Sequence, residues 1–304
     1  MPTLAVAIVC LAAVLLYRTL SNYSLEELKA ALVGIPPKRI GLMIFFAAAS
    51  YLCLTGFDWL ALRYVRRDVP YPKVALASFC SLSLGHNIGF AALSSGAIRY
   101  RFYTRWGASA GDIAKIIVFC GMTVGWGLAV LGGCASLLRP ELAARITGLP
   151  KGAMILLGAA LLTLAALYLA LSVLRQKPLH LWKWRIEVPS LRLAIGQVII
   201  GPTNFAFVAA CLYQALLAVQ DVPYFEVAAV YVIANVTSLI SHVPGGLGVI
   251  ETVVLYLLPG ANVIGALIAF RAVYFLLPLM IGAPLFAITE LILKQSNMAM
   301  RKKG

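Results

Sequence analysis

Long apolar stretches separated by short polar segments dominate the pattern of this chain. Six of these stretches are long enough to cross a membrane as helices, because a hydrocarbon core of about 30 Å requires about 20 apolar helical residues. They cover approximately residues 3–20, 40–62, 112–137, 152–174, 193–219 and 262–292. The pattern therefore predicts an all-α integral membrane protein in which each of these stretches is a full span.

The first apolar stretch is expected to remain in the protein as a helix. A secretory signal peptide has a basic segment before its apolar core and a small-residue cleavage site after it. The chain shows neither feature ahead of Tyr17 and Arg18. A retained first span therefore explains the pattern better than a cleaved signal does.

Composition agrees with a membrane protein and argues against several other classes. Hydrophobic residues make up 62% of the chain and charged residues 12%, whereas soluble domains average about half apolar and about a quarter charged. The formal charge of +14 does not indicate nucleic-acid binding, because Lys and Arg lie in short loops beside apolar stretches, where anionic lipid headgroups attract them. The cysteines lie in apolar segments without metal-ligand spacing: Cys10, Cys53, Cys80, Cys120, Cys134 and Cys211. We expect no disulfide, no metal and no other cofactor.

A short internal repeat indicates that the chain arose by duplication. "DVPYPKVALA" (68–77) and "DVPYFEVAAV" (221–230) are identical at six of ten positions and lie 153 residues apart. Each copy follows two apolar stretches, precedes an apolar stretch interrupted by glycine and histidine, and is followed by one more span. We therefore expect a single transmembrane domain over 1–304, with repeat halves at approximately 1–150 and 151–304.

Loop charges decide how the two interrupted stretches cross the membrane. If both cross fully, 11 Lys and Arg lie on the side of the C-terminus and 13 on the other side. If both are re-entrant hairpins, the division becomes 17 inside and 7 outside, with Arg271 in the membrane, as the positive-inside rule requires. The charges therefore favour six full spans plus two re-entrant helical hairpins, with both termini cytoplasmic. Three crossings separate the two copies, so the repeats have inverted topology, an architecture typical of secondary transporters.

The second interrupted stretch, "SLISHVPGGLGVIETVVL" (238–255), contains a predicted helix break. Pro244 lacks a backbone N–H group, and Gly245, Gly246 and Gly248 permit turns that other residues resist. A helix is expected to end near Val243 and a second one to begin near Gly248. Its N-terminus would offer free N–H groups to an anion such as a lipid phosphate.

These segments carry a resemblance to a known family. "SHVPGGLGVIE", "SSGAIRYRFY" (94–103) and "LTGFDWLALRYV" (54–65) resemble the transmembrane family of lysylphosphatidylglycerol synthase/flippase proteins, the multiple peptide resistance factor group of bacteria. The resemblance covers nearly the whole chain. It implies movement of aminoacylated phosphatidylglycerol from the inner to the outer leaflet. The family's cytosolic synthase domain has no counterpart here, so the resemblance implies a stand-alone flippase-like member or an isolated membrane domain, without aminoacyltransferase activity of its own.

Three charged residues are the first candidates for contact with a lipid headgroup. Glu251 lies in the first turn of the second half-helix and either caps it or binds a cationic group. Arg99 follows Gly96 as Glu251 follows Gly248, so the two opposite charges are expected to pair. Arg271 lies inside a span, where an unpaired charge costs at least about 2.5 kcal/mol. It is either a static partner of Glu251 or a phosphate ligand.

Further polar residues have both structural and functional interpretations. Asp58 is either the partner of a nearby arginine or a proton carrier. His86 and His242, at the two breaks, either bind headgroups and titrate or form buried hydrogen bonds. Asn204 follows Pro202 inside a span and is expected to accompany a kink.

The function predicted from these observations is lipid transport in the bacterial inner membrane. The expected partners are a phospholipid substrate and membrane lipids, and a separate lipid synthase remains open as a further partner. Two alternatives remain at this point: an intramembrane enzyme acting on lipid phosphates, with Glu251, His86 or His242 as acid or base, and a non-transporting partner of a synthase. The enzyme is disfavoured because the chain has no carboxylate pair, HExxH or nucleophile motif, so we assign no catalytic residue.

Overall fold

The computed structural model describes residues 25–88, 91–174, 179–181, 184–186, 188–241, 243–260 and 263–301. Its secondary structure is helical apart from one short antiparallel ribbon. The predicted first span, 3–20, lies outside these residues. The first half contains α2 (Leu25–Val33), α3 (Pro37–Tyr64), α4 (Tyr71–Ile88), α5 (Ala91–Arg105), α6 (Ala110–Leu138) and α7 (Pro140–Thr147). The second contains α8 (Lys151–Leu174), β1 (Leu179–Leu181), β2 (Trp184–Ile186), α9 (Leu191–Leu216), α10 (Tyr224–Ser241), η1 (Pro244–Gly246), α11 (Val249–Leu257), α12 (Val263–Arg271), the π-helical turn η2 (Ala272–Leu276) and α13 (Leu277–Arg301).

Six helical segments of the described chain are long and apolar enough to cross a membrane. Five of them coincide with predicted spans: α3, α6, α8, α9 and the continuous segment Val263–Ile292. The sixth is α10, which the loop charges assign to a hairpin arm instead. Its 18 residues extend about 27 Å at 1.5 Å per residue, so length and composition alone allow α10 to cross.

The outer surface of α8 shows what surrounds the protein. Large apolar side chains project from it into the surroundings: Leu156, Leu157, Leu164, Leu167, Leu171 and Leu174. An apolar surface of this kind is unfavourable in water and favourable against lipid chains. The chain is therefore a multi-pass membrane protein.

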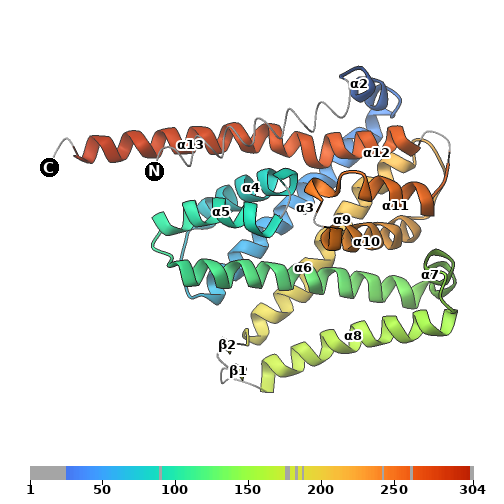
Figure 1. Cartoon of the computed structure of the whole chain (residues 1–304), viewed down its shortest axis with the longest axis horizontal. Helices are drawn as coiled ribbons and strands as arrows, with labels where there is room; N and C mark the ends of the chain where they lie inside the picture. The colour runs from blue at the N-terminus through green and yellow to red at the C-terminus, as the bar shows by residue number, and fades with distance from the viewer. Residues whose placement is uncertain are drawn as a thin grey trace.

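Helices α3 and α9 form the antiparallel centre of the bundle. Near the start of α3, Arg39 Nη1 donates to Gln214 Oε1 at 2.7 Å. Further along, Ser50 Oγ donates to Asn204 Oδ1 at 2.7 Å. The later position in α3 contacts the earlier position in α9, so the two helices run in opposite directions. Figure 1 shows both helices running obliquely through the middle of the molecule, across α6, α8 and α13.

A close backbone contact joins α6 to this centre. A methyl group added to Gly127 would lie 2.8 Å from the carbonyl oxygen of Gly201, and one added to Gly201 would lie 2.6 Å from the backbone oxygen of Thr123. Glycine is required at both positions because any larger residue would separate the helices, as at many contacts between membrane helices.

Two helical hairpins pack on opposite sides of the α3–α9 pair. The first consists of α4 and α5, which lie side by side in Figure 1, and the second of α10, η1 and α11. Helices α4 and α10 begin at Tyr71 and Tyr224, which are 153 residues apart, as the repeated sequences are. The packing is reciprocal, because α4 contacts α13 while α10 contacts α6.

Candidate functional site

The most deeply buried ion pair in the described chain joins the first hairpin to α3. Asp58 on α3 is fully buried and Arg99 on α5 is 3% exposed. Arg99 Nε donates to Asp58 Oδ1 at 2.7 Å, and Nη2 donates to Oδ2 at 2.8 Å. The two parallel hydrogen bonds form the bidentate arrangement in which arginine binds carboxylates most strongly.

Neighbouring hydroxyl groups satisfy the rest of this pair. Tyr103 Oη donates to Asp58 Oδ1 at 2.8 Å, and Ser78 Oγ donates to Oδ2 at 2.7 Å. On the other side, Arg99 Nη1 donates to Ser95 Oγ at 2.8 Å. A buried charge that lacks such partners would be strongly unfavourable. The Asp58 cluster, comprising Asp58, Ser78, Ser95, Arg99 and Tyr103, therefore fixes α5 against α3 and α4.

Sequence reasoning missed the three hydroxyl residues of the Asp58 cluster. A signal was present, because Ser95, Arg99 and Tyr103 follow one another at intervals of four residues. Side chains with this spacing share one face of a helix. A polar stripe on a helix of a membrane protein indicates a buried partner of opposite charge.

A second ion pair lies at the break of the second hairpin. Arg271, at the end of α12, donates from Nη2 to Glu251 Oε2 at 2.8 Å, and its Nε contacts Glu251 Oε1. The same guanidinium donates to the carbonyl oxygens of Gly245 and Gly246, both at 2.9 Å. The Arg271 side chain is 4% exposed and that of Glu251 16%. Arg271 therefore binds the carboxylate and also the carbonyl groups that the helix break leaves without helical partners.

The break itself has the predicted form. The φ angles of Gly245, Gly246 and Gly248 are 58°, 58° and 76°, in the left-handed region that side chains disfavour. Helix α10 ends at Ser241 and α11 begins at Val249. Glu251 thus occupies the first turn of α11, where the helix dipole favours a carboxylate.

The expected pairing of Arg99 with Glu251 does not occur. The donors of Arg99 are bound to Asp58 and Ser95, while Glu251 binds Arg271. The analogy between Gly96 and Gly248 failed because the first hairpin continues as a helix through residue 96, whereas the second breaks. Arg99 lies within α5 and is not a loop residue. Without it, the predicted division of Lys and Arg is 16 inside and 7 outside, so the positive-inside bias remains.

Of the two candidate histidines, His86 is among the described residues. His242 lies outside the described residues. His86, near the end of α4, is half-buried with its Nδ1 atom fully buried, and a methyl group on Gly245 would lie 3.3 Å from its backbone oxygen. The end of the first hairpin's α4 therefore meets the break of the second hairpin.

A neutral hydrogen-bond network occupies the centre of the α3–α9 pair. Ser50 Oγ donates to Asn204 and also lies 2.9 Å from Tyr274 Oη. All three side chains are buried. The predicted kink at Asn204 does not interrupt the element, since α9 continues through Pro202. Asn204 links α9 to α3 through Ser50.

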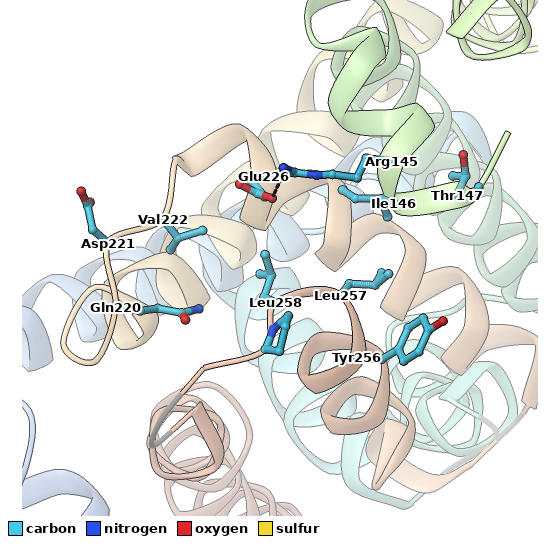
Figure 2. Close-up of a pocket in the computed structure, with 12 residues that line it drawn as sticks. Arg145, Ile146, Thr147, Gln220, Asp221, Val222, Glu226, Tyr256, Leu257 and Leu258 are labelled. Atoms are coloured by element: carbon cyan, nitrogen blue, oxygen red, sulfur yellow. Dashed lines mark hydrogen bonds and ion pairs between the residues drawn. The ribbon is translucent and has the colours of Figure 1, made fainter. Parts of the chain in front are cut away.

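A pocket of about 670 Å³ lies apart from both ion pairs, between α7, the α9–α10 connection and the end of α11. In Figure 2, Arg145 and Glu226 meet across it, with their contact at 2.6 Å drawn as a dashed line, and Asp221 and Gln220 lie on its other side. The pocket is lined by none of the predicted site residues. The chemistry expected from the sequence is therefore enclosed between helices and does not face this opening.

Comparison with known proteins finds relatives that match most of this chain. The chain is 31% identical over 264 residues to the uncharacterized protein slr0712 of Synechocystis sp., covering 86% of this chain and 82% of that protein. It is 28% identical to the inner membrane protein YbhN of Escherichia coli, covering 83% and 79%. It is also 23% identical to the phosphatidylglycerol lysyltransferase of Staphylococcus aureus over 92% of this chain, which corresponds to 33% of that protein.

A protein-family model matches nearly the whole length of the chain. Residues 3–282 match the lysylphosphatidylglycerol synthase TM region. This range includes both hairpins and both ion pairs. The chain belongs to the family described as the lysylphosphatidylglycerol synthase TM region.

Proposed function

We propose that this protein is a flippase of the bacterial inner membrane that moves phospholipid between leaflets, with aminoacylated phospholipid such as lysyl-phosphatidylglycerol as the substrate class. The family and the likeness to a phosphatidylglycerol lysyltransferase support the substrate class. The observation that carries the proposal is the presence of two ion pairs between helices, Asp58–Arg99 and Glu251–Arg271. Each anchors the second arm of one hairpin to a neighbouring helix.

The proposed architecture has six full spans and two re-entrant hairpins in an inverted-topology repeat. The offset of 153 residues between the starts of α4 and α10 supports the duplication. The antiparallel crossing of α3 with α9 supports inversion, because equivalent helices of a parallel repeat would run in the same direction. In such transporters, one repeat moves against the other around a fixed site near the midplane. The termini are cytoplasmic in this proposal, as the loop charges indicate.

The ion pairs would act as exchangeable partners for the headgroup. An aminoacylated lipid presents a phosphate anion and at least one ammonium group. The phosphate matches Arg99 and Arg271, and the ammonium group matches Asp58 and Glu251. Each buried charge needs a partner at all times, so a headgroup that replaces one partner allows a hairpin to separate from its helix. Gly245, Gly246 and Gly248, with their left-handed backbone, are the natural hinge for the second hairpin.

Reconstituted vesicles separate this proposal from its alternatives. Purified protein is placed in vesicles containing lysyl-phosphatidylglycerol, and a membrane-impermeant amine reagent then labels the accessible headgroups. A flippase raises the labelled fraction above that of the outer leaflet, while mass spectrometry finds the lipid chemically unchanged. A changed lipid mass would identify an enzyme instead. Labelling that stays at the protein-free level until a synthase is added would identify a non-transporting partner.

A further inference from the structure

Two polar atoms in the centre of the molecule are buried without a hydrogen-bond partner among the described residues. They are Tyr51 Oη on α3 and His86 Nδ1 on α4. The two rings lie 6.3 Å apart between centroids, at an angle of 65°. Leaving a buried polar group unsatisfied costs about 1–3 kcal/mol, so a ligand that satisfies both atoms of these neighbouring rings would be stabilised.

Aromatic side chains and the two ion pairs lie around His86. Arg99 lies close enough to His86 to interact with it electrostatically. On the other side, Phe275 lies 6.5 Å from the His86 ring and 5.3 Å from the Arg271 guanidinium. His86 therefore lies between the two ion pairs, and the Tyr51 ring lies beside it.

We propose that Tyr51 and His86 bind the phosphodiester of a phospholipid headgroup as it passes between the two ion pairs. The phenol of Tyr51 and the N–H group of a neutral imidazole both donate hydrogen bonds, and bonds to an anionic oxygen are stronger than bonds to a neutral one. A cationic amine is the poorer ligand here, because an ammonium group only donates hydrogen bonds and cannot accept those of Tyr51 and His86. The proposal rests on the proposed transport function and names the part of the substrate that this position recognises.

Both atoms are buried in the present conformation, and the break of the second hairpin packs against the His86 backbone. A methyl group on Gly245 would lie 3.3 Å from the His86 carbonyl oxygen and 3.8 Å from Arg271 Nη1. Movement of the Gly245–Gly248 break away from α4 is therefore the step that admits the phosphate. The same break is held by Arg271, so release of that arginine and exposure of His86 are linked.

Lipid competition on purified protein tests the assignment. Native mass spectrometry compares binding of phosphatidylglycerol, phosphatidic acid and diacylglycerol with the same acyl chains. For Tyr51→Phe we expect a loss of about tenfold in binding of both phosphate lipids relative to diacylglycerol, the loss typical for one hydrogen bond to a charged group. The melting temperature should not fall, because the variant removes an unsatisfied hydroxyl and keeps the ring. Tyr213→Phe, at a partly buried tyrosine of α9, is the matched control and should bind as the wild type does.

Variants of His86 provide an independent arm. His86→Leu should lose the same selectivity, and His86→Asn, whose amide nitrogen lies near the position of Nδ1, should retain part of it. Unchanged selectivity in folded Tyr51→Phe and His86→Leu would overturn the proposal and leave an internal water as the ligand. Loss of phosphatidylglycerol binding alone would also overturn it, by assigning the two groups to the glycerol hydroxyls. Failure of the transport function is a separate result, seen as absence of leaflet exchange by the wild type.

Discussion

Asp58 and Arg99 are joined by two hydrogen bonds of 2.7 and 2.8 Å at a place where neither residue is more than 3% exposed. They are 41 positions apart and belong to different elements, α3 and α5. The pair thus holds the first hairpin to the centre of the bundle. Its removal has consequences for folding that can be separated from those for transport.

Asp58→Asn should destabilise the protein strongly. The amide cannot neutralise Arg99, which remains buried, and removal of one member of a buried pair typically costs about 3–5 kcal/mol. Thermal denaturation of the detergent-solubilised variant measures this loss of stability as a fall in melting temperature. The double variant Asp58→Leu with Arg99→Met removes both charges and should recover most of the stability. A single variant as stable as the wild type would mean that the pair is not buried as described.

Glu251→Gln should affect stability less than Asp58→Asn does. Glu251 is partly exposed, and Arg271 keeps its hydrogen bonds to the carbonyl oxygens of Gly245 and Gly246. The two variants are compared in the same melting experiment. The reverse order would show that Glu251 contributes more to folding than its exposure and the remaining partners of Arg271 indicate.

Alanine substitutions at the break should differ in severity. Gly246→Ala brings a methyl group within 2.4 Å of Ser238 Oγ and 3.0 Å of Ile250 Cδ1, in addition to a φ of 58°. Gly248→Ala meets nothing within 4 Å, so only the left-handed backbone, at about 1–2 kcal/mol, opposes it. Melting temperatures should therefore fall further for Gly246→Ala. Equal losses would indicate that backbone strain alone decides.

The α6–α9 contact offers a matched pair on one helix. Gly127→Ala places a methyl group 2.8 Å from the Gly201 backbone and should destabilise by about 1–3 kcal/mol through overpacking. Gly125→Ala meets nothing within 4 Å and should be neutral or stabilising by up to about 1 kcal/mol, because alanine favours helix. Chemical denaturation of both variants checks the difference. A destabilising Gly125→Ala would contradict the packing of α6.

Thiol labelling in cells tests the proposed topology. Cysteines introduced singly at Lys73 and Arg105, both exposed positions flanking the first hairpin, should both resist an impermeant reagent added from outside. A cysteine at Asp221, at the start of the second hairpin, should react. Labelling of just one of the first two positions would mean that the first hairpin crosses the membrane, and the inverted repeat would be wrong.

Much of the helical architecture was predictable because hydrophobic length determines membrane helices. The spans at 40–62 and 152–174 match α3 and α8 within three residues at each end. The break at Pro244 followed from backbone chemistry alone. Side-chain partners were harder to predict from the sequence. Both Asp58 and Glu251 were plausible partners of Arg99, and the orientation of α5 about its axis is what directs Arg99 to Asp58. His86 was a candidate because it lies at the first interrupted stretch, but Tyr51 carries no local signal, since its relation to His86 arises from the packing of α4 on α3.

Leaflet exchange in proteoliposomes tests the central claim most directly. Vesicles carry phosphatidylglycerol with a fluorophore on its acyl chain, and an impermeant reductant bleaches the outer leaflet. We predict that the wild type makes nearly all of the fluorescence accessible, whereas folded Glu251→Gln leaves the inner-leaflet fraction protected, as protein-free vesicles do. The account would be contradicted if the inner-leaflet fluorescence stayed protected with the wild type and the amine-labelling assay also showed no movement of lysyl-phosphatidylglycerol. Exchange by Glu251→Gln at the wild-type rate would remove the Glu251–Arg271 pair from the mechanism.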